Sequence, residues 1–212
     1  MQTEISKRRA DIGTAIENSK VGDSNSNGRV ERSIRDLKGM VRTLKSALAD
    51  KLNMPVTLDM AIVPWLVRHA SYLITRCRVR KSGKTALQLI KGRKSLTELL
   101  PFGELVLFKI PKTAHAIGSF EDRWESGLWL GSTIRDGMHL IGTGEGVFKV
   151  GTIRARPDGE HWSQDAVRAL VGSPAQPQPG TGGRKIIAFA KKKGENQKPD
   201  QGGLQPPTDT LP

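Results

Sequence analysis

Apolar residues recur along the first half of the chain at steps of three and four positions. They are Val30, Ile34, Leu37, Val41, Leu44 and Leu48. Residues with this spacing share one face of an α-helix, so the stripe predicts a helix that runs to about Leu52. Asn27 or Ser26 is placed to cap its first turn, and Pro55 follows its end. Residues 22–28, rich in Ser, Asn and Gly, predict a turn and loop before this helix. Residues 12–19 before that loop predict a short strand.

A second helical pattern occupies 58–80, with Pro64 either kinking the helix or marking its true first turn. A shorter helical piece follows at 85–93. The period then changes from 3.6 to 2, which predicts strands. The alternating runs cover 102–110, 127–134, 137–143 and 146–156. Residues 163–172 predict a terminal helix capped by Ser163.

These patterns predict an α+β protein in which helices precede a small antiparallel barrel or sandwich. We divide the chain into a helical part (1–100), a small β-barrel part with its terminal helix (101–172) and a tail (173–212). The tail is rich in Pro, Gly and Gln, with a basic patch at 184–193. Such a composition is typical of disorder.

Charge indicates the class of partner. The formal net charge is +13 with a pI near 10.2, which favours a polyanion such as nucleic acid. No acid lies between Asp59 and Glu98. That window holds Arg68, Arg76, Arg78, Arg80, Lys81, Lys84, Lys91, Arg93 and Lys94. One cysteine, Cys77, excludes an internal disulfide, and no signal-peptide or membrane-length apolar run occurs. We therefore expect an intracellular protein that does not bind membranes.

Other candidate motifs are weak. "SGKT" at 82–85 lacks the leading glycine of a phosphate-binding loop and lies between two predicted helices. "GTGEG" at 142–146 lacks the dinucleotide spacing and predicts a hairpin turn. His69 has no second ligand nearby, so packing or solvation is the better interpretation than catalysis. The four tryptophans lie in apolar patterns, which favours core packing over base stacking.

The stretch "SNSNGRVERSIRDLKGMVR" resembles the end of the catalytic core of retroelement integrases, matching at Asn27, Gly28, Val30 and Glu31. "PWLVRHASYLITR" and "GKTALQLIKGRKSLTELLPFGELVLF" resemble the segments that follow in copia-type polyproteins. "RWESGLWLG" is similar to a later hairpin of the same region. The resemblance covers roughly 12–156, and its motifs occur in the family's order.

The resemblance implies a partial RNase H-like core, here one edge strand plus outer helices, followed by a small β domain. In this family three carboxylates bind two Mg²⁺ or Mn²⁺ ions for phosphoryl transfer to DNA. Glu31 would be the last of the three, both catalytic and metal-binding. The basic row after it would grip DNA. The candidate nucleic-acid-binding residues are Asn27, Arg35, Lys38, Arg42, Arg76, Arg78, Arg80, Lys81 and Lys84.

The chain departs from the family where the other two acids belong. In the family, the second aspartate lies so far before the glutamate that the matching position in this chain would precede Met1. Asp11 and Asp23 lie too close to Glu31 in sequence to replace that aspartate. We therefore expect a fragment of a retrotransposon polyprotein that is inactive alone, retains DNA or RNA binding and acts in the nucleus. We also expect exposed apolar helix faces and self-association in its amino-terminal half.

Three alternatives remain open. The first is a complete metal-dependent integrase whose recorded sequence starts too late, which would make Glu31 catalytic in the true product. The second is a non-catalytic basic nucleic-acid-binding adaptor in which Glu31 only complements the helix dipole. The third, and weakest, is a binder of membrane surfaces or acidic proteins.

Overall fold

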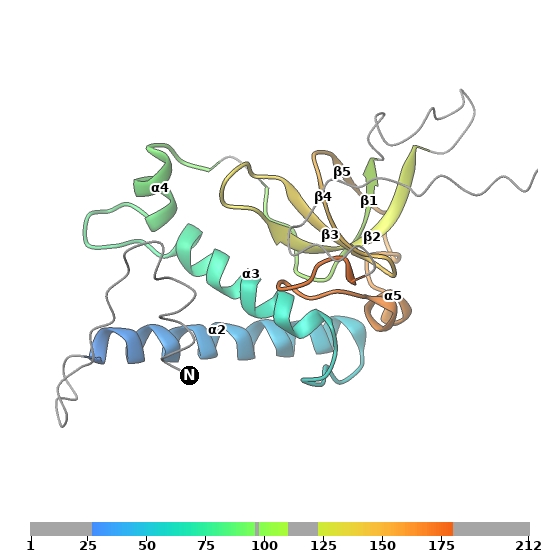
Figure 1. Cartoon of the computed structure of the whole chain (residues 1–212), viewed down its shortest axis with the longest axis horizontal. Coiled ribbons are helices and arrows are strands. Elements are labelled where there is room, and N and C mark those ends of the chain that lie inside the picture. The colour runs from blue at the N-terminus through green and yellow to red at the C-terminus, as the bar shows by residue number, and fades with distance from the viewer. Residues whose placement is uncertain (1–26, 96–97, 110–122, 180–212) are drawn as a thin grey trace, which may run out of the picture.

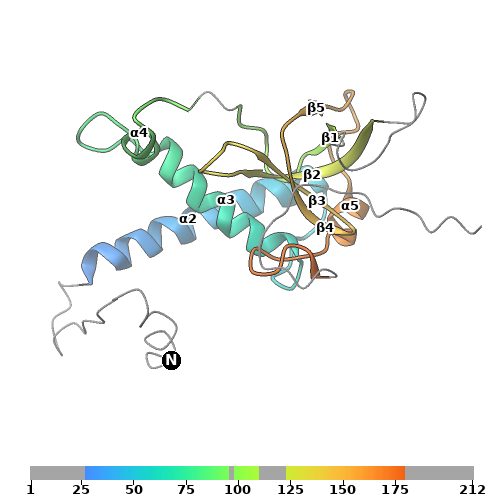
Figure 2. The same ribbon diagram turned by 45° about the horizontal axis from the view of Figure 1, so that its top comes forward.

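The computed structural model describes residues 27–95, 98–109 and 123–179, and these form an α+β fold (Figure 1). Helices come first along the chain and an antiparallel sheet follows, which confirms the predicted class. The two long helices lie side by side, and α3 lies between α2 and the sheet (Figures 1 and 2). The strand expected at 12–19 falls outside the described residues.

Helix α2 (Gly28–Leu52) confirms the prediction from the apolar stripe. It ends where Asn53 adopts a left-handed conformation (φ 49°) and Gln164 Nε2 donates to the carbonyl of Leu52 at 2.8 Å. Asn27 occupies the N-cap position, and its side chain makes no capping hydrogen bond. Ser26, the other predicted cap, lies outside the described residues. The end of the stripe is buried at Leu48 and Leu52, whereas its beginning is exposed.

Helix α3 (Ile62–Cys77) begins two residues before Pro64, so the proline lies in the first turn, as one of the two interpretations required. It contributes the most deeply buried helical side chains, among them Trp65 and Leu66. The short helix α4 (Ala86–Lys91) follows, fixed by a capping box between Thr85 and Gln88.

Five strands form one antiparallel sheet in the order β4-β3-β2-β1-β5. They are β1 (Leu105–Lys109), β2 (Trp124–Ser132), β3 (His139–Thr143), β4 (Gly146–Val150) and β5 (Ile153–Ala155). Strand β1 pairs with β2 in the register Leu105 opposite Leu128, and with β5 in the register Val106 opposite Ala155. A bulge interrupts the β2–β3 pairing after Trp129.

The sheet is strongly curled although its hydrogen-bonded order is open. Strands β4 and β5 lie at opposite edges, yet only Gly151 and Thr152 separate them in sequence. Side chains from all five strands also gather into one apolar cluster. These are Val106, Phe108, Trp129, Ile141, Phe148, Val150 and Ile153. The curl lets the sheet bury its concave face on itself; the predicted closed barrel is not confirmed.

A larger core joins the helices to the other face of the sheet. Leu48 of α2 and Trp65 of α3 pack in one cluster with Leu128 and Leu140 of the sheet. The terminal helix α5 (Gln164–Ala169) adds Val167, and Ser163 Oγ caps it as predicted by accepting from the Ala166 N–H at 3.2 Å. One core therefore spans the boundary drawn at residue 100.

The beginning of the predicted tail, residues 173–179, lies among the described residues and contacts β4. The Val147 N–H donates to the Pro177 carbonyl at 2.9 Å, and Gln178 Nε2 donates to the Val147 carbonyl at 3.3 Å. Pro177 and Gln178 therefore satisfy both backbone groups of Val147 on the edge strand β4. Composition did not reveal this contact because it depends on where the fold places this segment. The rest of the tail lies outside the described residues.

We expect Gly131→Ala and Gly39→Ala to change stability in opposite directions. Gly131 has φ +116°, and an added Cβ would lie 2.7 Å from His69 Nδ1, so we expect a loss of about 1–3 kcal/mol. Gly39 lies inside α2 with open space around it, so alanine should stabilise the protein by about 0.5–1 kcal/mol. Urea unfolding measures both; a neutral Gly131→Ala would contradict the close α3–β2 contact.

Candidate nucleic-acid interface

Positive charge is concentrated on the helices at one end of the molecule. Residues 28–45 and 76–94 together carry fourteen Lys or Arg and two acids, Glu31 and Asp36. The sheet part, 98–109 with 123–179, carries seven Lys or Arg and eight acids. The amino end of α2, the carboxy end of α3 and α4 lie together, away from α5 and most of the sheet (Figures 1 and 2). We call residues 28–45 and 76–94 the basic end.

A short hairpin between α3 and α4 carries four of the predicted nucleic-acid-binding residues, Arg78, Arg80, Lys81 and Lys84. Val79 and Thr85 form a β-bridge, and the Arg80 N–H donates to the Lys84 carbonyl at 3.0 Å. Gly83 allows the reversal because it adopts φ +74°. Residues 78–85, here the basic hairpin, therefore present Arg80, Lys81 and Lys84 exposed on one turn.

Both ends of the basic hairpin are fixed. Arg78 Nη1 lies 2.5 Å from Asp36 Oδ2, which ties the hairpin to α2. At the other end, the Thr85 capping box joins it to α4. Cations held on a structured loop lose less conformational entropy on meeting phosphates than cations on a free loop. Arg78, predicted as a binding residue, therefore also has a structural role.

The predicted row on α2 lines an open groove beside α3. Arg35, Lys38 and Arg42 form its charged side with Glu31. Its apolar side consists of Ile34, Leu37 and Val41 of α2 and Val67 of α3. We call these eight residues the α2 groove.

Arg76 is partly used within the fold. Its Nη1 donates to the Tyr72 hydroxyl at 2.9 Å, and its guanidinium lies 5.9 Å from the Tyr72 ring centroid. Arg68, one turn below Tyr72, lies 5.5 Å from the Trp65 ring, and burial lowers its pKa. Arg68 stays charged even so, because a guanidinium loses its proton only far above neutral pH.

The structure adds two cations that the sequence did not suggest. Arg135 and Lys149 come from the sheet and line a groove against α3, facing Arg68. The carbonyl of Arg135 accepts a hydrogen bond from Lys91 Nζ at 2.5 Å, which joins this groove to α4. No local signal marked them, because both lie in the part of the chain where charges balance.

Two polar side chains line the same groove as Arg135 and Lys149. Ser132 Oγ is buried there without a hydrogen-bond partner. Asp136 also faces the groove, but it accepts a hydrogen bond from Thr133 and pairs with Lys149 at 3.8 Å, so its charge is partly neutralised. The groove can therefore accept an anion although one acid lies in it.

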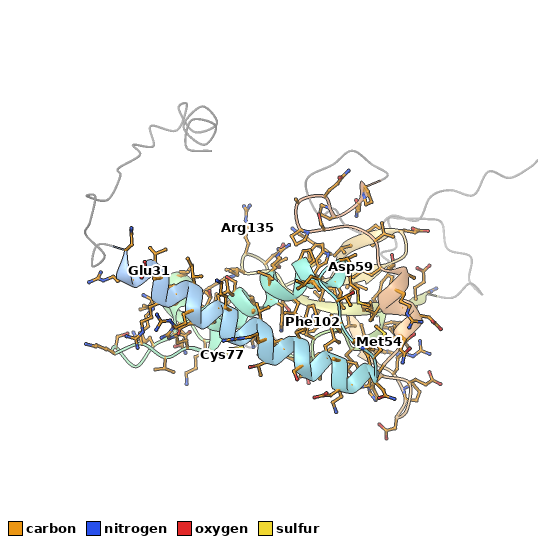
Figure 3. The ribbon with its side chains drawn as sticks, turned by 90° about the horizontal axis from the view of Figure 1, so that it is seen from below. Glu31, Met54, Asp59, Cys77, Phe102 and Arg135 are labelled. Atoms are coloured by element: carbon orange, nitrogen blue, oxygen red, sulfur yellow. The ribbon has the colours of Figure 1, made fainter. Side chains whose placement is uncertain are left out.

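Glu31 does not lie in a metal site among the described residues. It is exposed at the projecting end of α2, far from Met54 beyond the other end (Figure 3). Its neighbours in the α2 groove are cations, and the next acid on the helix, Asp36, is paired with Arg78. Across 27–95, 98–109 and 123–179, no three His, Cys, Asp or Glu side chains form a metal-binding group.

Mg²⁺ or Mn²⁺ was expected only if further carboxylates are supplied, and otherwise no metal. Among the described residues Glu31 is one carboxylate among cations, and one carboxylate does not hold a divalent ion. Asp11 and Asp23, which are too close to Glu31 in sequence to act as the family's partner acids, lie outside the described residues. No catalytic step follows from the described geometry.

His69, Trp65 and Trp129 pack in the core, as predicted for these three residues. His69 packs against Phe102 and Trp129, with ring centroids 5.2 and 5.3 Å away, and burial lowers its pKa to about 4. Trp65 and Trp129 are fully buried. Trp124 is covered on one face by Arg154, whose guanidinium lies 4.3 Å from the ring centroid.

A scan of protein-family models and searches of the curated proteins and the solved structures returned no match. No helix within the described ranges is long and apolar enough to cross a membrane.

We expect acid to destabilise the protein through His69. Its folded pKa of about 4 lies below the ordinary value of 6.5, so the unfolded chain binds the proton more readily and stability falls as pH drops through this window. Between about pH 7 and pH 4.5 the loss should be about 2–3 kcal/mol. His69→Asn should flatten that pH dependence in urea unfolding, whatever its effect at neutral pH.

His161 serves as a control for His69 because its pKa is shifted in the opposite direction. Its hydrogen bond to Glu104 raises its pKa, so its protonated form stabilises the fold below pH 6.5, and this contribution disappears as pH rises through the folded pKa. His161→Gln should therefore steepen the loss of stability in acid. Equal pH profiles for all three proteins would show that neither histidine controls the acid response.

Proposed function

We propose that this chain binds nucleic acid through the basic end, by contacts with phosphates rather than with bases. The observation that carries the proposal is the convergence of fourteen cations and two acids on one end, with Arg80, Lys81 and Lys84 presented on a fixed hairpin. Phosphate contacts give affinity without sequence information. DNA is the proposed partner, with RNA as the alternative.

The proposed path of the polyanion runs from the basic hairpin to the groove against the sheet. Lys91, Arg93 and Lys94 follow the hairpin, and they line a pocket with Thr133 and Asp136 of the sheet part. Arg135 and Lys149 extend the positive surface beyond it. The two fully buried tryptophans, Trp65 and Trp129, cannot stack on bases, so the proposed affinity comes from phosphate contacts, which carry no sequence information.

We further propose that the chain descends from a retrotransposon integrase and is inactive alone. The ordered motifs around Asn27, Gly28 and Glu31 and the succession of helices and antiparallel sheet support this descent. In this proposal α2 and α3 are outer helices of an RNase H-like core, and the curled sheet is its small barrel. DNA strand transfer, a nuclear activity, would need carboxylates and Mg²⁺ or Mn²⁺ beyond what the described residues hold.

Two alternatives differ in the role of Glu31. In a complete integrase Glu31 would act with further acids and a metal ion. In a nucleic-acid-binding adaptor it would only complement the α2 dipole, and its exposed place in the first turn of α2 favours this role.

Nucleic-acid affinity should fall steeply with salt. If the basic end neutralises about six phosphates, the dissociation constant for a short DNA duplex should rise about a thousandfold between 50 and 200 mM salt. The triple variant Arg80→Gln/Lys81→Gln/Lys84→Gln removes three contacts, so the log–log salt slope should become shallower by about 2.7. Fluorescence anisotropy measures both.

A matched control changes three exposed cations of the sheet part. Lys109→Gln/Arg123→Gln/Arg168→Gln removes the same charge and should leave the salt slope nearly unchanged. Equal effects of the two triple variants would mean that net charge, and not the basic end, attracts the polyanion. Circular dichroism checks that both variants fold.

Glu31→Gln tests the metal-dependent alternative. Because cations surround Glu31, removing its charge should leave DNA affinity unchanged or raise it about twofold, equally with Mg²⁺ and with chelator at matched ionic strength. An increase in affinity with Mg²⁺ or Mn²⁺ that Glu31→Gln abolishes would contradict the proposal. That result would favour a functional metal site.

A further inference from the structure

The amino-terminal half of the α2 stripe is left uncovered. Val30, one turn before Ile34 and outside the α2 groove, is 59% exposed. Within the groove, Ile34 of α2 is 47% exposed and Val67 of α3 is 38% exposed. Leu37 and Val41 continue the apolar surface and are half-buried. Single exposed apolar residues are common, but this set is contiguous along one groove, which is typical of an interaction surface.

Nucleic acid does not account for this surface. A phosphate backbone meets Arg35, Lys38 and Arg42 on the charged side of the α2 groove, but it gains nothing from covering Ile34, Leu37 or Val67. A ligand that suits both sides must present apolar side chains next to negative charge. An amphipathic helix with acids along one border has this pattern.

We propose that the α2 groove docks an acidic amphipathic helix of another protein. The partner's apolar stripe lies on Ile34, Leu37, Val41 and Val67, and its acids pair with the charged side. Arg35, Lys38 and Arg42 are spaced at i, i+3 and i+7, so they form a nearly straight row on α2. This site is additional to nucleic-acid binding and does not depend on it.

The charged row also sets the length and direction of the partner. From Glu31 to Arg42 the row spans about 16 Å at 1.5 Å per residue, so about three turns of a partner helix cover it. Glu31, at one end, is the single acid of the row. A basic residue at the matching end of the partner helix therefore fixes which way the helix lies.

A second copy of this chain suits the groove poorly. Its own row carries three cations and one acid, so pairing two rows sets mostly like charges against each other. The whole basic end adds to this repulsion through its excess of positive charge. Charge complementarity therefore favours an acidic partner over self-association.

The test uses a labelled synthetic helix of about 18 residues, with a leucine stripe bordered by glutamates and one terminal lysine on the same border. We expect the full chain to bind it with a dissociation constant on the order of 10 µM by fluorescence anisotropy. Ile34→Ser/Val67→Ser should weaken binding about tenfold or more. Arg35→Gln/Lys38→Gln should weaken it through the charged side.

The controls separate groove docking from general attraction. Leu58→Ser/Leu89→Ser removes two exposed apolar side chains outside the groove and should leave peptide affinity unchanged. A scrambled peptide of the same composition lacks the stripe and should bind at least tenfold more weakly. Equal binding of both peptides, or no effect of Ile34→Ser/Val67→Ser, would overturn the proposal.

Failure of this proposal is distinguishable from failure of nucleic-acid binding. Arg80→Gln/Lys81→Gln/Lys84→Gln should weaken DNA binding but keep peptide affinity, whereas Ile34→Ser/Val67→Ser should do the reverse. Light scattering tests whether a second copy of this chain occupies the α2 groove instead. A dimer that Ile34→Ser/Val67→Ser dissociates would assign the groove to a second copy and overturn the proposal.

Discussion

The packing of α3 between α2 and the sheet is the constraint on which the rest of the structure depends. Trp65 and Leu66 are fully shielded from water in the core shared by the helices and the sheet, and Trp65 Nε1 donates to the Gly172 carbonyl at 2.9 Å. On the sheet side, Gly131 leaves space for His69. This packing places the basic hairpin, at the carboxy end of α3, beside α2. The cations of both segments of the basic end therefore lie on one surface.

Much of the fold follows from local patterns. The stripe from Val30 to Leu48 predicted α2, and Pro64 and Ser163 marked helix starts that the structure has. Composition did not reveal that Pro177 and Gln178 contact β4, because that contact depends on where the fold places this segment. The open order of the curled sheet was likewise not readable from alternation, since it depends on which strand ends meet.

In the candidate site too, some residues could be predicted from the sequence and others only from the fold. Arg80, Lys81 and Lys84 were readable because they cluster in an acid-free window, whereas Arg135 and Lys149 join them only through the fold. For Glu31, the local motif suggested a site that the described part of the fold does not support. A local motif can nominate a metal ligand, but a metal site needs several carboxylates to converge, and those of the described residues do not. The apolar stripe of α2 is continuous in sequence, but only its second half packs against the core.

The central claim is that polyanions meet the basic end and not the rest of the surface. Lysine-acetylation footprinting with mass spectrometry, with and without a short DNA duplex, tests it most directly. The account predicts that DNA protects Lys81, Lys84 and Lys94 and leaves Lys51 and Lys109, which are equally exposed but outside the basic end, open to acetylation. Protection at Lys51 and Lys109 equal to that at the basic hairpin would contradict it.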